Sequence, residues 1–315
     1  MGAIINAARL HRHGEPLQIE SVELPEPGEG EVRVELAFGG VNPVDRYMAE
    51  GSVAPQVPLP RTLGAEASGR LDGRPVLVAG GGLGAIRDGV WAQAAVVPRD
   101  SIHELPEGVD LRHAAAMGVA GLTAWHVVCD VAQVSGDDRV LVLGASGGVG
   151  SMIVSLARSL GAAVWGQTGS AEKAAPIEED GAERVVVAGP DELAEAISEF
   201  QPTVVFDPLG DGFVPVLVEA LAVRGRIVSF GTSAGPEVQF NLQSLYRKSG
   251  SLRGYGGMQL SPGERRAGLG AALAALRDGR LRVRVGDVLA LEDVNDACQR
   301  LVERRVQGKL LLELG

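Results

Sequence analysis

The chain has 315 residues, 45% of them hydrophobic, and a formal net charge of −11. This length favours about two domains of roughly 150 residues each, and the acidic balance argues against nucleic acid or an anionic membrane surface as the main partner. The two cysteines, Cys129 and Cys298, are too few for a disulfide framework or a thiolate zinc cluster and are expected to be buried and inert. Because no run resembles a signal peptide or reaches the ~20 apolar residues of a membrane span, a cytoplasmic protein is expected.

Short apolar runs separated by turn residues characterise the first ~115 residues, as counted in the sequence. The runs cover residues 3–5, 32–36, 76–78 and 94–97. Apolar runs bounded by Pro/Gly-rich turns predict a β-rich domain with irregular loops. Residues 110–129 follow with closely spaced small apolar residues, and they predict a helix.

Strands and helices alternate from Val140 onward, a pattern typical of a parallel sheet. The expected strands are residues 140–143, 163–166, 184–187, 204–207, 226–230 and 252–255. The helices expected between them are residues 148–160, 173–180, 192–200 and 213–221. Six strands in two halves predict a complete doubly wound, dinucleotide-binding sheet. Two more helices (262–278 and 291–304) precede the apolar run 309–314, which has no place in a completed sheet and is expected to return to the first domain.

The most informative segment is the glycine-rich turn that follows the first of these strands. Gly147 lets the backbone approach a pyrophosphate, and Gly150 lets the following helix pack close to the strand. The amides that open the helix attract phosphate. Ala145 stands where a strict G-x-G-x-x-G motif has its first glycine, so a merely structural turn is the alternative. The residues predicted to bind a nucleotide here are Ala145, Ser146, Gly147, Gly148, Val149 and Gly150.

The end of the second strand indicates which nucleotide is bound. A carboxylate about 20 residues past the turn would bind a ribose 2′-hydroxyl, but none stands at the strand tip. Ser170 offers a hydrogen bond and Lys173 a positive charge, and both suit a 2′-phosphate. Against this, Ser170 can be a helix N-cap, and Glu172 adds a negative charge. The sequence favours NADPH over NADH.

Several further segments are informative together with the turn. They are Gly40-Val41-Asn42-Pro43-Val44-Asp45-Arg46-Tyr47, Leu63-Gly64-Ala65-Glu66-Ala67-Ser68-Gly69, Gly121-Leu122-Thr123-Ala124-Trp125, Phe230-Gly231-Thr232 and Gly308-Lys309. Over nearly the whole chain, these segments resemble the zinc-independent quinone oxidoreductase branch of the medium-chain dehydrogenase/reductase superfamily. The resemblance implies an α/β protein with a GroES-like β-rich domain and a Rossmann domain whose doubly wound parallel sheet has six strands. Residues 1–116 would be the first part of the GroES-like catalytic domain, 117–256 the Rossmann domain, and 257–315 the return to the catalytic domain.

Two departures from the zinc alcohol dehydrogenases of this superfamily bear on the chemistry. Those enzymes carry a cysteine where this chain has Asn42, and a metal-binding histidine where it has Ala65. An amide and a methyl group cannot replace a thiolate and an imidazole as zinc ligands. The cysteine-rich structural zinc lobe is absent as well, and the histidines suggest no other ligand set. No metal site is therefore expected.

The resemblance implies that Asn42 and Tyr47 lie near the nicotinamide and the substrate. Asn42 would donate a hydrogen bond to the negative charge that develops on an acceptor oxygen, and Tyr47 would donate a hydrogen bond or a proton. The alternatives are that Asn42-Pro43 is a turn pair and that Tyr47 only packs. Asp45 is expected to order the loop rather than to transfer protons.

Four more cofactor-binding residues follow from the resemblance. Thr123 would lie beside the nicotinamide. Leu209, Gly231 and Thr232 belong to loops after the fourth and fifth strands, at the carboxyl edge of the sheet where ligands bind. Many relatives have a tyrosine near the 2′-phosphate after the third strand, where this chain has Ala188-Gly189. The preference for NADPH is therefore expected to be weaker.

The expected function is an NADPH-dependent reductase of a quinone or an α,β-unsaturated carbonyl, with a small-molecule hydride acceptor as its partner. One alternative is an enoyl-thioester reductase, which would present a basic patch formed by Arg46, Arg61, Arg70 and Arg74. A second alternative is a non-catalytic module that senses NADPH, because fold alone does not define activity. A homodimer is expected through the edge strand 252–255.

Overall fold

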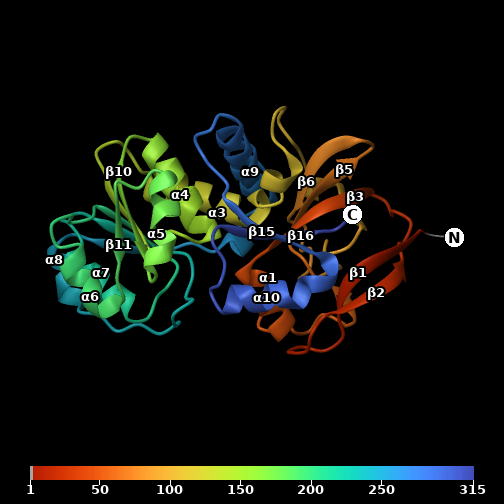
Figure 1. Cartoon of the computed structure of the whole chain (residues 1–315), viewed down its shortest axis with the longest axis horizontal. Coiled ribbons are helices and arrows are strands. Elements are labelled where there is room, and N and C mark those ends of the chain that lie inside the picture. Colours follow the sequence, from red (N-terminus) through yellow and green to blue (C-terminus); the bar gives the residue numbers. More distant parts are fainter. Residues whose placement is uncertain (1–2) are drawn as a thin grey trace. The chain divides into compact units, whose positions relative to one another are not determined.

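The computed structural model describes residues 3–315, which form two compact units (Figure 1). Unit 1 comprises the described residues up to Leu122 together with 261–277 and 283–315. Unit 2 comprises residues 123–260 and 278–282. No helix among the described residues is long and apolar enough to span a membrane.

Unit 1 is built mainly on antiparallel strands. In a three-stranded sheet, β1 (Ile4–Leu10) lies between β2 (Gln18–Glu23) and β4 (Arg61–Thr62). A seven-stranded sheet has the order β15-β16-β3-β5-β6-β8, with β7 also paired to β3. Its strands are β3 (Glu31–Val41), β5 (Glu66–Leu71), β6 (Arg74–Ala79), β7 (Ala94–Pro98), β8 (Ile102–Glu104), β15 (Val285–Ala290) and β16 (Lys309–Glu313).

The core of unit 1 joins residues from both ends of the chain. Along β3 the side chains alternate, with Val34 and Leu36 buried, as expected for a strand with one face on the core. On the neighbouring strand β16, Leu310 and Leu312 belong to the same core cluster. β16 pairs antiparallel with β3 and parallel with β15. The expected return of the last apolar run to the first domain is confirmed.

Two helical segments within residues 40–132 differ in detail from the predictions. The expectation that residues 110–129 are helical is confirmed, but the segment is not one regular α-helix: α2 (Leu111–Ala114) is followed by a π-helix (Met117–Gly121), α3 (Leu122–Trp125) and a second π-helix (His126–Ala132). The first π-turn presses on β6, where a Cβ on Gly118 would lie 2.6 Å from that of Ala79. The segment 40–47, for which the resemblance implied a loop, instead enters a helix at Pro43, where α1 (Pro43–Glu50) begins. The other α-helices of unit 1 are α9 (Pro262–Arg277) and α10 (Val294–Val302).

Unit 2 contains a six-stranded sheet with the order β11-β10-β9-β12-β13-β14, and all its neighbouring strands are parallel. This doubly wound order places a switch point beside β9 and leaves β14 at an edge. The predicted fold class and strand positions are confirmed. The strands are β9 (Arg139–Val142), β10 (Ala163–Thr168), β11 (Arg184–Val187), β12 (Val204–Asp207), β13 (Arg226–Ser229) and β14 (Ser251–Gly254).

Helices of unit 2 connect these strands, as the alternating pattern predicts. They are α4 (Gly148–Ser159), α5 (Ala174–Glu179), α6 (Pro190–Ala196), α7 (Phe213–Ala220) and α8 (Leu242–Arg247). The helix expected over 192–200 starts earlier, because Gly189 is its N-cap and Pro190 its first residue, a favoured helix start. α8, which Asn241 caps through its side chain, was not predicted.

Candidate functional site

The glycine-rich turn between β9 and α4 is held firmly to the neighbouring strand. The backbone N–H of Gly144 donates to the Gln167 side chain at 3.0 Å, and that of Ala145 donates to the Gln167 carbonyl at 2.9 Å. A Cβ on Gly150 would lie 2.4 Å from the Gly144 carbonyl oxygen. A side chain at position 150 would therefore push α4 away from the turn.

The N-terminus of α4 suits a phosphate-bearing ligand. Its N-cap is Gly147, no side chain caps it, and its first turn carries no acidic residue. The first N–H groups of a helix have no intrahelical partner and lie at the positive end of the helix dipole. A dinucleotide pyrophosphate fits this end, since the glycines leave the backbone accessible and no carboxylate repels it.

Two further loops follow β12 and β13 at the same edge of the sheet. The buried carboxylate of Asp207 accepts hydrogen bonds from the N–H groups of Leu209 (2.8 Å) and Gly210 (3.1 Å), and burial raises its pKa. A Cβ on Gly231 would lie 2.9 Å from the Pro208 carbonyl oxygen. The two loops are thus packed together, next to the turn after β9, and they carry the predicted residues Leu209, Gly231 and Thr232.

The residues predicted to select the nucleotide lie directly after β10. Ser170 occupies the N-cap position of a short 3-10 turn (Ala171–Lys173), but its side chain makes no capping bond. Instead its hydroxyl donates to the Glu172 carboxylate at 3.0 Å. A negative charge therefore lies beside Ser170 together with the positive charge of Lys173, so the two influences on a 2′-phosphate oppose each other. Thr123, the other predicted cofactor residue, lies half-buried on α3.

A separate cluster of buried polar side chains lies in unit 1, around the start of α1. Asn42 is the N-cap and Pro43 the first residue of this helix. The carboxylate of Asp45 accepts the backbone N–H of Asn42 at 2.8 Å and that of Ala65 at 3.0 Å. Burial raises the Asp45 pKa to about 7. Asp45 joins two segments of backbone, in line with the loop-ordering role expected for it.

Glu66 and Lys309 complete this cluster, and no role was predicted for either residue. The Lys309 ammonium lies 2.6 Å from Asn42 Oδ1 and 3.0 Å from Glu66 Oε1. Asn42 Nδ2 donates to the same Glu66 oxygen at 2.7 Å. Both residues belong to segments that carry the family resemblance. Because 243 positions separate them in the sequence, no local pattern predicts that they pair.

Tyr47 lies on α1, one helical turn after Pro43. Its side chain is partly exposed, and the Arg46 guanidinium lies 5.0 Å from its ring centroid. A cation over the ring face is a favourable contact, and it helps to hold the ring in place.

The described residues suggest no ligand set for a metal. Among residues 3–315, no group of three or more His, Cys, Asp or Glu side chains is placed to hold an ion. Cys129 and Cys298 are only partly buried, which corrects the expectation that both are buried. Desolvation still raises their thiol pKa values to about 11 and about 12, so both remain poor thiolates.

The structure also corrects the basic patch considered for a thioester substrate. Arg61 is buried, with 2% of its surface exposed, and it donates to the Ala85 carbonyl at 2.6 Å. Its burial lowers its pKa. Arg61 therefore stabilises the interior of unit 1, and its charge is not available to a ligand at the surface.

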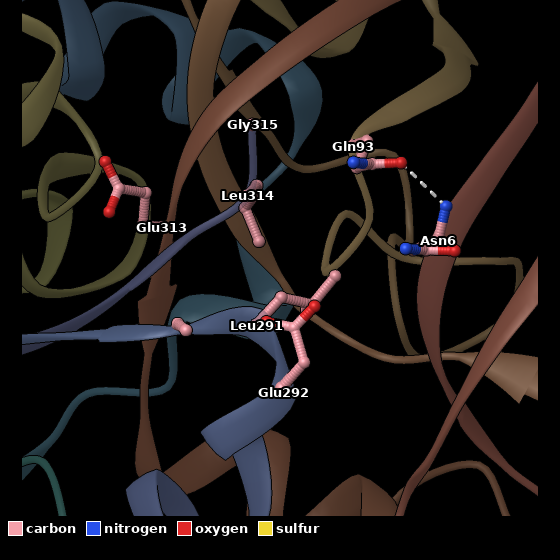
Figure 2. A pocket seen from close by; sticks show the side chains of 8 residues that line it. Asn6, Gln93, Leu291, Glu292, Glu313, Leu314 and Gly315 are labelled. Carbon is pink, nitrogen blue, oxygen red and sulfur yellow. Dashed lines mark hydrogen bonds between the residues drawn. The ribbon is translucent and has the colours of Figure 1, made fainter.

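Figure 2 shows a cavity of about 300 Å³ in unit 1 that none of the predicted site residues lines. Two glutamates are among its lining residues, and the Asn6 backbone N–H donates to the Gln93 side chain at 2.9 Å on its wall (Figure 2). This acidic lining disfavours an anionic nucleotide. The lining residues are Asn6, Gln93, Ala290, Leu291, Glu292, Glu313, Leu314 and Gly315.

Comparisons with known proteins agree with this architecture. A family model described as zinc-binding dehydrogenase matches residues 148–272. A quinone oxidoreductase of Salmonella typhimurium is 32% identical, covering 96% of this chain and 98% of that protein. The structure of mycobacterial Rv1454c complexed with NADPH superimposes with a TM-score of 0.87 at 26% identity, covering 98% of this chain and 99% of the other.

Metal-bound proteins share the fold too. A cobalt- and zinc-bound thermostable alcohol dehydrogenase from Pyrobaculum aerophilum superimposes with a TM-score of 0.85 at 29% identity, covering 99% of this chain and 100% of the other. The fold and the glycine-rich turn define an oxidoreductase with a Rossmann domain and a GroES-like domain. The chain belongs to the medium-chain dehydrogenase/reductase superfamily, in its quinone oxidoreductase-like branch.

Proposed function

We propose that this protein is an NADPH-dependent, metal-free reductase that delivers hydride to a quinone or an α,β-unsaturated carbonyl. The observation that carries the proposal is the buried amide of Asn42, bonded to Lys309 and Glu66. This position offers hydrogen-bond donors to an acceptor, whereas an amide and the methyl group of Ala65 are not zinc ligands. The quinone oxidoreductase names of relatives and the NADPH complex of Rv1454c support the same reading.

The bound cofactor would supply the hydride. The residues of this chain bind and orient the reactants. The α4 N-terminus, with Gly147 and Gly150, accepts the pyrophosphate, while Ser170 and Lys173 bind the 2′-phosphate. Asn42 donates an N–H to the acceptor oxygen as negative charge develops there, and Tyr47 donates a hydrogen bond or a proton.

The selectivity for NADPH is expected to be modest. Glu172 accepts the hydroxyl hydrogen of Ser170 and adds a charge that a 2′-phosphate would avoid. Replacing Lys173 with methionine should therefore raise the KM for NADPH about 10-fold, because a charge-assisted bond is lost, and leave the KM for NADH nearly unchanged. Glu172→Gln is the matched variant, and it should shift the preference toward NADPH.

The decisive experiment follows the loss of reduced-nicotinamide absorbance with a quinone, an enone and an enoyl thioester. Each acceptor is tested with NADPH and with NADH, with and without a chelator. Turnover of the quinone or enone that the chelator leaves unchanged would support the proposal. Turnover of the thioester alone, dependence on a metal, or no turnover with any acceptor would contradict it, and the last result together with NADPH binding would favour a sensing module.

We also propose that two copies pair through their β14 strands. β14 is an edge strand of the unit 2 sheet, and Leu252 is 37% exposed there. An edge strand has backbone N–H and C=O groups free for pairing with a second strand. The isologous contact that results is the commonest route to a homodimer.

A further inference from the structure

We infer that Lys309 and Glu66 are positioning residues that fix the direction of the Asn42 amide, so that one Nδ2–H stays available for the acceptor oxygen. The inference rests on the proposed function, because that N–H serves the reduction of an acceptor. Neither residue touches the reacting atoms in this scheme. Both act through Asn42, and the hydrogen bonds of the cluster show how.

The two neighbours of the Asn42 side chain allow only one orientation of its amide. An ammonium can only donate hydrogen bonds, and a carboxylate can only accept them. Asn42 Oδ1 accordingly faces Lys309 at 2.6 Å, and Asn42 Nδ2 faces Glu66 at 2.7 Å. The flipped amide would place N–H groups against an ammonium and an oxygen against a carboxylate. Chemistry thus settles which atom is nitrogen and which way it points.

A count of hydrogens shows which one is left over. The three protons of Lys309 match three acceptors: the Val41 carbonyl at 3.2 Å, Asn42 Oδ1 at 2.6 Å and Glu66 Oε1 at 3.0 Å. The other Glu66 oxygen accepts the backbone N–H of Val119 at 2.8 Å. Within residues 3–315, the second hydrogen on Asn42 Nδ2 is the only side-chain N–H of this cluster without an assigned acceptor. This hydrogen is the donor that the proposed reaction needs.

Burial holds the Asn42–Lys309–Glu66 cluster in place and strengthens the polarisation of the Asn42 amide. The side chain of Glu66 is 0% exposed and that of Lys309 is 4% exposed. In such a low-dielectric setting, an ammonium on the amide oxygen strengthens the N–H donor at the other end of the amide. Gly40 makes room for the carboxylate, since a Cβ there would lie 2.3 Å from Glu66 Oε1. A buried ion pair that is needed only for stability can often be replaced by apolar residues. The Lys309–Glu66 pair also makes specific hydrogen bonds to Asn42, and these bonds indicate that the pair positions the Asn42 amide.

The orientation of the amide can be observed directly. The sequence contains four asparagines, Asn6, Asn42, Asn241 and Asn295. Selective 15N-asparagine labelling therefore gives few side-chain amide signals, and those lost in Asn42→Asp belong to Asn42. We expect slow hydrogen exchange for these signals in the wild type, and fast exchange with shifted resonances in Lys309→Met. Lys248→Met is the control, because Lys248 binds the Val218 carbonyl at 3.1 Å in unit 2.

Kinetics test the consequence of that orientation. Lys309→Met should lower kcat by about 100-fold, the order of magnitude seen when one preorganised donor is lost. The KM for the nucleotide should stay within about 3-fold of the wild-type value, because uniform binding is unchanged. Lys248→Met should keep the wild-type kcat. A Lys309→Met enzyme with full kcat and unchanged Asn42 signals would overturn the inference.

A second variant guards against simple misfolding. Asn42→Asp combined with Glu66→Gln exchanges the amide and the carboxylate without a change in size or net charge. In this variant residue 42 can still accept a hydrogen bond from Lys309 and one from the side chain of residue 66. Residue 66 can still accept the backbone N–H of Val119. Only the bond between Lys309 and residue 66 is lost. The variant has no side-chain N–H at position 42. We expect a folded protein with low kcat, and full activity in this variant would overturn the inference.

The inference and the proposed function fail in distinguishable ways. If the wild type reduces no acceptor, the proposed function fails, and the role of the cluster in reduction falls with it. The amide signals then still decide whether Lys309 orients Asn42. If the wild type reduces a quinone or an enone and Lys309→Met does so equally well, only the inference fails.

Discussion

Replacing Gly150 with alanine should destabilise unit 2 and weaken nucleotide binding. The new Cβ would lie 2.4 Å from the Gly144 carbonyl oxygen and 2.8 Å from Ala145 Cα. Reaching ordinary contact at 3.4 Å requires a movement of about 1 Å. The turn resists this movement because Gln167 holds the N–H groups of Gly144 and Ala145. Alanine gains about 0.5–1 kcal/mol as a helix former, but overpacking costs about 1–3 kcal/mol, so we expect a net loss of about 1–2 kcal/mol.

Differential scanning calorimetry measures the first effect, and titration with NADPH measures the second. A loss of this size should lower the Tm of unit 2 by about 2–8 °C, and a displaced turn should weaken NADPH binding about 10-fold or more. Gly270→Ala, in the exposed middle of α9, is the control, since a Cβ there would meet nothing within 4 Å. It should raise stability by up to about 1 kcal/mol. If Gly150→Ala raises the Tm in the same way, the argument from close packing is refuted.

Three further predictions concern charges and the sheet edge. The pKa of Asp45 rises from 3.8 in the unfolded chain to about 7 in the folded protein, so the native state binds this proton more tightly. The stability that the protonated Asp45 contributes is full below about pH 4 and is lost as the pH rises through about 7. The Tm of Asp45→Asn relative to that of the wild type should therefore increase between pH 5 and pH 8. Asp138→Ala should lower the free energy of unfolding by about 3 kcal/mol, which is measured as a lower Tm. The reason is that the largely buried charge of Arg226 then loses its ion-pair partner, which lies at 2.8 Å in the wild type. Leu252→Lys on the edge strand should give a monomer in sedimentation at micromolar concentration, and a wild type that is already monomeric would contradict the proposed pairing.

The unit 2 sheet could be predicted because its signals are local. Each strand is a short apolar run between turn residues, and β11 and β12 begin and end where the sequence placed them. α1 also had a local signal that went unused, since Asn42, Pro43 and Asp45 are a favoured N-cap, first residue and N-terminal carboxylate. The interpretation of this segment as a loop gave too little weight to these capping residues.

The missed features depend on contacts between distant segments. The π-turn at Met117–Gly121 forms where the Val119 N–H binds the Glu66 carboxylate, 53 residues away. The Lys309–Glu66 pair spans most of the chain. No local pattern of hydrophobicity or turn residues reports such pairings, because they are set by which strands become neighbours in the sheet. The segments that carry the candidate site residues stand out in the sequence, but the hydrogen-bonded partners of those residues do not.

The return of β16 to unit 1 has a consequence for the order of events during synthesis on the ribosome. All six strands of unit 2 have left the ribosome before β16 is made, and domains generally fold as units in the order of their synthesis. Unit 1, by contrast, lacks Leu310 and Leu312 of its core, and Lys309 beside Glu66, until that late stage. The nascent chain therefore carries an unfinished β-sheet with open edges while unit 2 is already assembled. Chaperones that shield apolar edges are expected to act on unit 1 during this interval.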